Sequence, residues 1–405
     1  MNLGNNQNYG GEAKIVDQLD ASDLTYLADE ETNVVVERSQ KKQFSQKNAY
    51  TQRETMVFTL NTGQDYISAR NSSLKLTLDN LTAADTVTFG GGSILNLFEN
   101  IRIISRDGSV LTEVSQLNLY NYFALKLNHT RAWRVGQQGT RLLGCNAAVP
   151  VAGNVFVIPL KDIIPFFDQD VLIPANVARG LRIEIVLAPL ETAFKVVALT
   201  SYTVSGPELL LDSYRLSGGA MSALNQMAAG SGLVMTYKDV NNSNSEKADT
   251  VGNINLEARQ AVSMANSVFT CVRLKSTATD KTLDSFATRD VTSSDSFQYR
   301  IGSVYLPQER ILGPIEYYAQ TSYCWGKMAN GHEIGIETGT EENDNVLACA
   351  TLDRYWTSGS GMAINASTVL TFTSKVATAG ICSVDLFLCH TRRLTAFLEN
   401  ITVQD

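Results

Sequence analysis

The stretch Val155–Leu187 constrains the fold of this chain more than any other part of its sequence. It holds two apolar runs, Val155–Leu160 and Leu181–Leu187, and in the second run apolar residues alternate with Arg182 and Glu184. A period of two places successive side chains on opposite faces of a strand. The stretch therefore predicts two β-strands, the second with one face on a core.

The connection between these two runs is itself apolar, since Ile163, Ile164, Phe166 and Phe167 follow one another closely around Pro165. Proline has no amide hydrogen to donate, so this segment cannot be a central strand. An apolar connection cannot remain in water and must lie against its own domain or against a partner. We therefore take these two isoleucines and two phenylalanines as candidate subunit-contact residues.

Short strands separated by polar turns recur along the rest of the chain. About eight of them fall between residues 54 and 215, a number that suits a jelly-roll sandwich, and a second β-rich series begins at Leu233. A chain of 405 residues is also too long for one ordinary core, which favours two domains. We predict an all-β fold of two consecutive eight-stranded jelly-roll β-sandwiches.

Four segments are expected on this basis. They are an extended N-terminal arm at 1–50, a first jelly roll at 51–217, a linker at 218–232 and a second jelly roll at 233–405. Short inserted helices are expected at Val114–Leu127 and Ile315–Cys324, where apolar residues recur at three- and four-residue steps. The linker is rich in glycine and small residues and could itself form a short helix.

The arm carries a local basic run in a protein whose net charge is −8. Its cations are Arg38, Lys41, Lys42 and Lys47. Such a run is either a solvated surface or part of an extended arm that orders only against neighbouring subunits or an underlying surface. We treat these four side chains as candidate arm contacts.

Signals for catalysis or cofactor binding are sparse, and neither an enzyme activity nor a cofactor nor a metal is expected. The histidines lie in unrelated contexts, at His129, His332 and His390. None has a second histidine at the spacing of a metal site. We see neither a secretory signal peptide nor an apolar run of about 20 residues that could span a bilayer.

An acidic chain has no general electrostatic reason to bind nucleic acid, and no sequence-specific binding is expected. Trp133, which lies between Arg131 and Arg134, could stack on a single-stranded base. The same residue types also anchor subunit contacts, and we favour that interpretation for Trp133.

The order of these features resembles the double-jelly-roll major capsid proteins of tailless icosahedral DNA viruses, a group that includes adenovirus-like, tectivirus-like and virophage-like coats. The resemblance is carried by Asn100–Gly108 leading into the helix from Val114, by Ile158–Ile185, by Ser303–Pro307, and by Asp385–Leu388 followed by Arg392–Leu394. It extends from roughly residue 50 to the C-terminus and is a pattern of elements rather than a diagnostic motif.

The resemblance implies a structural subunit of the virion that forms homotrimers, which are the pseudo-hexagonal capsomers of an icosahedral shell. Its partners would be neighbouring capsomers, together with penton or minor capsid proteins and an internal membrane. The arm would lie at the capsomer base, and the polar loops Asp284–Ser296 and Gly331–Asp344 would face outward.

Two other functions compete with this one. A carbohydrate-binding or carbohydrate-active protein can also have two β-sandwiches, but it needs paired carboxylates or exposed aromatic platforms. A fibre or adhesin subunit is the third possibility. A trimer that survives dilution would favour the coat protein, whereas a monomer that binds glycan would favour the carbohydrate protein.

Overall fold

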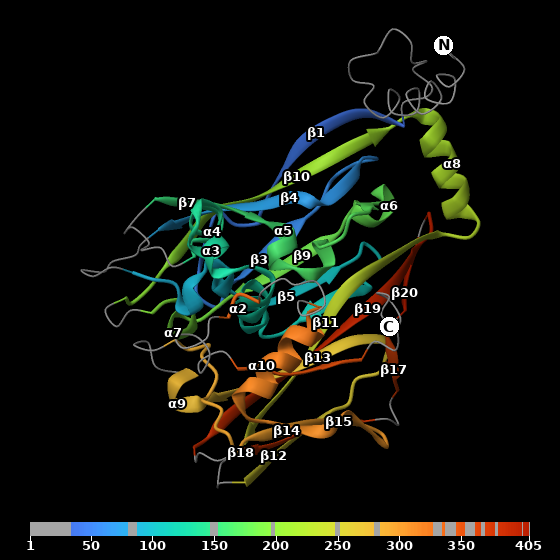
Figure 1. Ribbon diagram of the computed structural model, residues 1–405. Helices are drawn as coiled ribbons and strands as arrows, with labels where there is room; N and C mark the ends of the chain where they lie inside the picture. Colours follow the sequence, from blue (N-terminus) through green and yellow to red (C-terminus); the bar gives the residue numbers. More distant parts are fainter. Residues whose placement is uncertain are drawn as a thin grey trace, which may run out of the picture.

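The computed structural model describes residues 34–79, 87–145, 153–195, 199–247, 252–278, 284–326, 334–336, 346–352, 361–365, 369–376, 380–398 and 400–404. The part of the expected arm before residue 34 and most of the loop Gly331–Asp344 lie outside these residues. The described residues form four antiparallel sheets, which make two sandwiches, one above the other in Figure 1. The predicted all-β class is confirmed.

The first sandwich consists of two facing sheets. One has the strand order β1 (Val35–Phe44), β10 (Thr203–Leu216), β4 (Tyr66–Asp79), β7 (Asn154–Pro159). The other has the order β3 (Thr55–Thr59), β9 (Arg182–Leu187), β5 (Phe98–Ile104), β6 (Val110–Val114). Two short strands join the first of these sheets, β2 (Ala49–Thr51) beside β10 and β8 (Leu172–Ile173) beside β4.

The second sandwich is built in the same way. One sheet has the order β11 (Leu233–Lys247), β19 (Cys382–Ala396), β13 (Val262–Leu274), β16 (Ala348–Thr351). The facing sheet has the order β12 (Gly252–Ala258), β18 (Leu370–Val376), β14 (Ser296–Ile301), β15 (Val304–Leu312). The short strands here are β17 (Met362–Ile364) beside β13 and β20 (Ile401–Gln404) beside β19.

The two sandwiches share one topology. When the four short strands are set aside and the others are numbered along the chain, each sandwich has one sheet ordered 1-8-3-6 and one ordered 2-7-4-5. Interleaving the first and last strands in this way produces the nested Greek keys of an eight-stranded jelly roll. The prediction of two consecutive jelly rolls is confirmed, and we call them roll 1 and roll 2.

Helices are inserted at the same place in both rolls, between strands 5 and 6. Roll 1 has α2 (Leu117–Asn128), α3 (Arg131–Val135) and α4 (Gln137–Leu143) there, and roll 2 has α10 (Gly313–Cys324). Helix α2 begins three residues later than predicted because Val114 ends β6 and Gln116 has a positive φ of 52°. The expected linker contains α8 (Gly218–Ala229), which lies at one side of the molecule in Figure 1.

The remaining helical elements of the described residues are single turns. They are η2 (Gly90–Gly92), η3 (Ile94–Leu97), α5 (Leu160–Ile163), η4 (Pro165–Phe167), α6 (Ala175–Ala178), α7 (Leu190–Ala193) and α9 (Lys275–Ala278).

Strand β1 comes from residues that the sequence analysis assigned to the arm. It pairs with β10 from Val35 opposite Leu216 to Phe44 opposite Glu208, and it is strand 1 of roll 1. Exposure alternates along the second half of β1, but the inward side chains, such as Ser39, are polar and only partly buried, so the strand shows no apolar face. An ordered roll 1 therefore begins before residue 50.

The stretch Val155–Leu187 behaves partly as predicted. Ile183, Ile185 and Leu187 on β9 are fully buried, whereas Arg182 is exposed. The two isoleucines and two phenylalanines of the connection are all fully buried within their own chain. Phe166 packs edge-on against Tyr237 of β11, with ring centroids 4.9 Å apart.

This placement corrects the assignment of Ile163, Ile164, Phe166 and Phe167 as subunit contacts. Because their side chains have no exposed surface, they offer nothing to a second chain in this structure. The apolar connection does cover a second domain, but that domain is roll 2 of the same chain.

The loop Asp284–Ser296 also differs from its expected outward position. Phe286 is buried and stacks on Tyr122 of α2 with centroids 5.4 Å apart, and Arg289 forms a buried ion pair with Asp295 at 2.8 Å. The polar sequence of this loop reflects internal ion pairing rather than exposure.

Candidate functional site

The junction between the two rolls is an apolar contact built on aromatic rings. Phe269 of β13 and Phe387 of β19 are fully buried and stack with centroids 5.0 Å apart. Tyr120 of α2 lies 6.0 Å from the first ring and 5.9 Å from the second. Neighbouring side chains such as Leu386 belong instead to the separate interior core of roll 2. The outward face of the β11–β19–β13 sheet is therefore apolar and covered by roll 1 (Figure 1).

A buried carboxylate adds polar contacts to this junction. Asp239 of β11 accepts hydrogen bonds from Thr112 of β6 and, at 3.2 Å, from Nη1 of Arg392 on β19. His390 Nε2 lies 3.9 Å from the same carboxylate. Burial raises the pKa of Asp239, although the histidine, the threonine and the arginine oppose that shift. The carboxylate thus joins strands of both rolls, at the cost of its own desolvation.

A cleft of about 680 Å³ opens at the same junction. Among its lining residues are Tyr120, His129, Asp162, Asp168, Lys238, Asp239, Trp325 and His390. Glycoside hydrolysis needs two carboxyl groups about 5 to 10 Å apart that are available to the sugar. Here Asp168 pairs with Lys238 at 2.9 Å and Asp239 pairs with Arg392, so two of the three lining aspartates are already engaged by cations.

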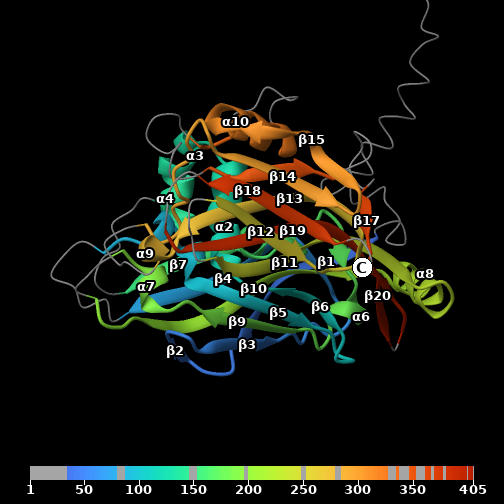
Figure 2. The same cartoon turned by 90° about the horizontal axis from the view of Figure 1, so that it is seen from below.

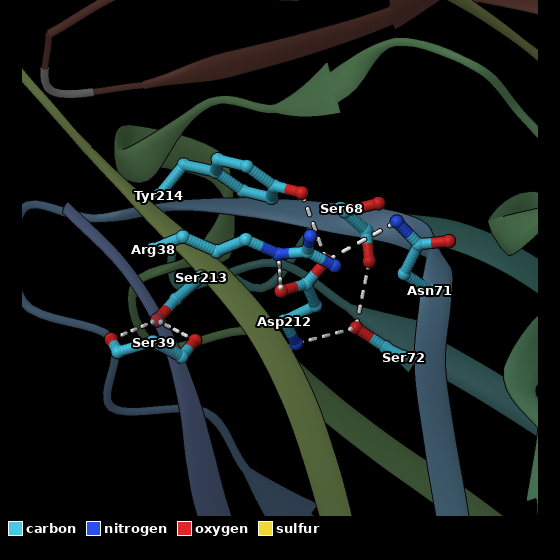
Figure 3. A network of polar contacts seen from close by, with 8 residues as sticks. All are labelled: Arg38, Ser39, Ser68, Asn71, Ser72, Asp212, Ser213 and Tyr214. Atoms are coloured by element: carbon cyan, nitrogen blue, oxygen red, sulfur yellow. Dashed lines mark hydrogen bonds and ion pairs between the residues drawn. The ribbon is translucent and has the colours of Figure 1, made fainter. Parts of the chain in front are cut away.

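The face of roll 1 that corresponds to this covered sheet lies at the opposite end of that roll, on β1, β10 and β4 (Figure 1). Figure 3 shows its central network, in which Arg38 donates to both oxygens of Asp212 at 2.9 and 3.0 Å. Asn71 and the Tyr214 hydroxyl donate to the same carboxylate at 3.2 and 3.0 Å. Burial alone would raise the pKa of Asp212, but these hydrogen bonds outweigh it and the pKa is lowered.

A second acid on this face is bound in a similar way. Glu208 accepts a hydrogen bond from Lys75 at 2.7 Å and lies 3.6 Å from Lys42. The hydrogen bond from Lys75 lowers the pKa of Glu208, with further lowering from Lys42. This face is a ladder of ion pairs, in contrast to the aromatic face of roll 2.

All four predicted arm cations are paired within their own chain. Arg38 and Lys42 take part in the ladder, Lys41 pairs with Asp65, and Lys47 pairs with Glu54 at 3.0 Å. They therefore fasten β1 and the residues after it to roll 1, and their role as contacts with neighbouring subunits stays a prediction.

Trp133 lies on α3 and is half-buried. Its ring stacks on His129 with centroids 3.7 Å apart, and its Nε1 donates to Gln138 at 2.8 Å. Arg134 is buried and donates to the carbonyl of Gly335, so it is turned away from solvent. This orientation weakens the interpretation of the tryptophan and its arginines as a nucleic-acid site and leaves Trp133 itself as a surface candidate.

The sequence analysis missed Asp212 and Asp239. A usable signal existed, since each interrupts an otherwise strand-like segment and Asp212 follows three leucines. A carboxylate within an apolar strand needs a cationic or hydrogen-bonding partner.

No group of three or more His, Cys, Asp or Glu side chains in the described ranges is placed to hold a metal ion. No helix in the same ranges is long and apolar enough to cross a membrane.

Comparisons with known proteins rest on structure alone. No protein-family model matches the sequence, and no curated protein matches it. Vp54 of PBCV-1, in a crystal structure fitted into a reconstruction of the virophage Sputnik, superposes with a TM-score of 0.62, at 9% identity over 91% of this chain and 96% of that one.

Two proteins that are named as major capsid proteins are also similar. The Faustovirus protein has a TM-score of 0.60 at 10% identity over 90% of this chain and 91% of its own. The mavirus protein has a TM-score of 0.53 at 11% identity over 90% of both chains. Over about nine-tenths of its length, this chain has the double-jelly-roll fold of major capsid proteins.

Proposed function

We propose that this chain is the major capsid protein of an icosahedral DNA virus and works in the virion shell as a structural subunit rather than as an enzyme. The observation that carries the proposal is the repetition of one roll topology along the chain, which the Faustovirus and mavirus major capsid proteins match over nine-tenths of their lengths. A coat protein needs large complementary surfaces rather than a reactive pocket.

The assembly unit that we infer is a homotrimer. Each chain supplies two units of the same topology, so three chains supply six and close a ring of pseudo-sixfold symmetry. Around this ring, the contact between roll 1 and roll 2 within a chain would alternate with a corresponding contact between roll 2 of one chain and roll 1 of the next. Such trimers would pack beside neighbouring capsomers to form the shell.

The remaining partners follow from the same proposal. Penton and minor capsid proteins and an internal membrane would lie next to this shell, on the side where the arm at 1–50 is expected. Trp133, half-buried on α3, remains a candidate contact for a neighbouring subunit. The junction cleft does not favour the carbohydrate protein, because two of its three lining aspartates are engaged by cations.

Native mass spectrometry of the purified chain tests the proposal. We expect a species of three chain masses that persists on tenfold dilution, and electron microscopy of concentrated or co-expressed protein should show closed shells. A stable monomer that binds sugars on a glycan array would contradict the proposal and support the carbohydrate protein instead.

A further inference from the structure

We propose that the trimer closes through a contact in which β15 and α10 of one copy pack on β1 and β10 of the next copy. This inference rests on the proposed function and adds to it the surfaces that meet. It follows from the repeated topology, because the chain already contains one example of the contact between two rolls.

The intrachain junction defines which elements take part. Roll 1 contributes strand 5 (β6), the helix inserted after strand 5 (α2), and the turn η4. Roll 2 contributes strands 1, 8 and 3 (β11, β19 and β13). In the contact between two copies, the corresponding elements on one copy are strand 5 of roll 2 (β15) and its inserted helix α10. On the other copy they are strands 1, 8 and 3 of roll 1 (β1, β10 and β4).

The first of these surfaces is uncovered and carries apolar side chains at both ends of β15, with Gln308, Glu309 and Arg310 exposed between them. On β15 and the start of α10, the exposed side chains include Val304 (50%), Tyr305 (47%), Leu312 (53%) and Ile315 (78%). The corresponding elements of roll 1 have buried apolar residues where they meet roll 2, as Leu111 on β6 illustrates. An apolar surface of this kind on an edge strand and its neighbouring helix marks an interaction site.

The second surface also leaves apolar side chains open. Val36 and Phe44 of β1 are 64% and 66% exposed. On β11, the corresponding strand of roll 2, Met235 and Tyr237 are only 3% and 2% exposed because roll 1 covers them. The comparison identifies β1 as a strand that lacks the cover its counterpart has.

An ion pair joins strands 1 and 8 in both rolls. Asp239 on strand 1 of roll 2 pairs with Arg392 on strand 8, and in roll 1 the charges are exchanged, with Arg38 on strand 1 and Asp212 on strand 8. The Asp239 side chain is 2% exposed beneath β6, whereas the Arg38 side chain is 62% exposed. The outer pair is therefore placed where strand β15 of the next copy would cover it.

The arrangement of the elements requires a second copy as the occupant. In Figure 1, β1 lies at one end of the molecule and β15 lies at the other, so neither surface can reach the other within one chain. Figure 2, seen from below, places β15 and α10 together along one margin. Two different surfaces at opposite ends form a head-to-tail contact rather than a twofold one, and such a contact closes into a ring when the rotation between copies is right, which is the closure inferred for three copies.

The first experiment compares two isoleucine variants by native mass spectrometry. We expect Ile315→Glu to weaken trimer association at least 100-fold, because it places a charge in an apolar contact. Ile381→Glu is the matched control, since Ile381 is 53% exposed directly before β19 and lies on neither surface. Phe44→Glu should repeat the effect of Ile315→Glu from the other side, with unchanged circular dichroism in all three variants.

The second experiment identifies the partner surface directly. A photo-crosslinking amino acid replaces Tyr305, and the protein is assembled from a mixture of isotopically light and heavy chains. We expect heavy–light crosslinked peptides that join position 305 to residues 34–53 or 203–217.

The outcomes separate the two proposals. A wild-type trimer in which Ile315→Glu and Phe44→Glu have no effect, or in which position 305 crosslinks to roll 2 of another copy, overturns this inference and leaves the trimer standing. A wild-type chain that stays monomeric at every concentration overturns both the inference and the proposed function.

Discussion

The two rolls carry the same sheet, ordered 1-8-3-6, in opposite surroundings. In roll 2 its outward face holds stacked phenylalanines and a buried carboxylate, and roll 1 covers it. In roll 1 its outward face holds a ladder of ion pairs and stays open to solvent in the single chain. The difference shows how one topology serves both a covered apolar contact within the chain and an open face of paired charges.

The physical distinction is between a face that loses its water as the chain folds and a face that stays hydrated in the single chain. A continuous apolar face left exposed on the single chain would promote non-specific association, whereas the aromatic face of roll 2 is covered by roll 1 of the same chain. Ion pairs satisfy their own charges in water and cost less to expose. Roll 1 thus has a few exposed apolar side chains, such as Phe44, among paired charges rather than a continuous apolar face.

The largest expected effect comes from truncating the covered face. Phe387→Ala removes a fully buried ring from the junction and should lower the free energy of unfolding by about 3 to 5 kcal/mol. Phe44→Ala, the matched change on the open face, should alter it by about 0.5 kcal/mol or less when the chain is kept dilute enough to be monomeric. Urea titration followed by tryptophan fluorescence measures both, and equal losses would show that the two faces do not differ.

A smaller effect is expected from the two carboxylates. Asp239→Ala leaves Arg392 without its buried partner and should cost about 3 kcal/mol, since breaking a buried pair strands the remaining charge. Asp212→Ala should lower the free energy of unfolding by less than half as much as Asp239→Ala does, because Arg38 can return to water. Differential scanning calorimetry of both variants, with Asp212→Asn as the isosteric control, checks the order. A larger loss from Asp212→Ala would reverse the comparison.

Much of this fold follows from sequence because side-chain period reports which face of a strand is buried. The alternation at Ile183, Ile185 and Leu187 identified β9, and the spacing of Leu117 and Phe123 identified α2. Both elements have an apolar face against a core, which is the case in which a period is visible.

Strand β1 could not be found in this way. Its inward side chains include Ser39 and Lys41, and its outward side includes Arg38 and Lys42, so it has no apolar period. What holds it in place is pairing with acids on β10 and before β4, far away in the sequence. A single sequence does not reveal such partners.

The candidate subunit contacts were misplaced for a different reason. The rule that an apolar connection must be covered was correct for Phe166 and Phe167, which are fully buried. The rule does not say whether the cover belongs to the same chain or another one. Here it is largely the chain's own core, with Tyr237 of roll 2 against Phe166.

The smallest expected effect is a difference in how the two first strands respond to acid. The pKa of Glu208 is lowered, first by its hydrogen bond from Lys75, and that of Asp212 is lowered because its hydrogen bonds outweigh burial. Acids with a lowered pKa stabilise the folded state at pH values above their unfolded pKa, near about 4, and lose that contribution as the pH falls through the lowered value. Asp239 has the opposite sign, because burial raises its pKa and protonation relieves the cost of burying its charge.

Hydrogen–deuterium exchange at pH 6 and pH 3, corrected for intrinsic exchange rates, measures this difference on β1 and β11. We expect protection of the β1 amides to fall at pH 3 while that of the β11 amides is retained, because only β1 depends on ionised acids with lowered pKa values. Glu208→Gln is the matched control and should reduce the pH dependence of β1 without affecting β11. If β11 loses protection before β1, the carboxylate at the junction is the pH-sensitive one, and the open face of roll 1 is held by something other than its ion pairs.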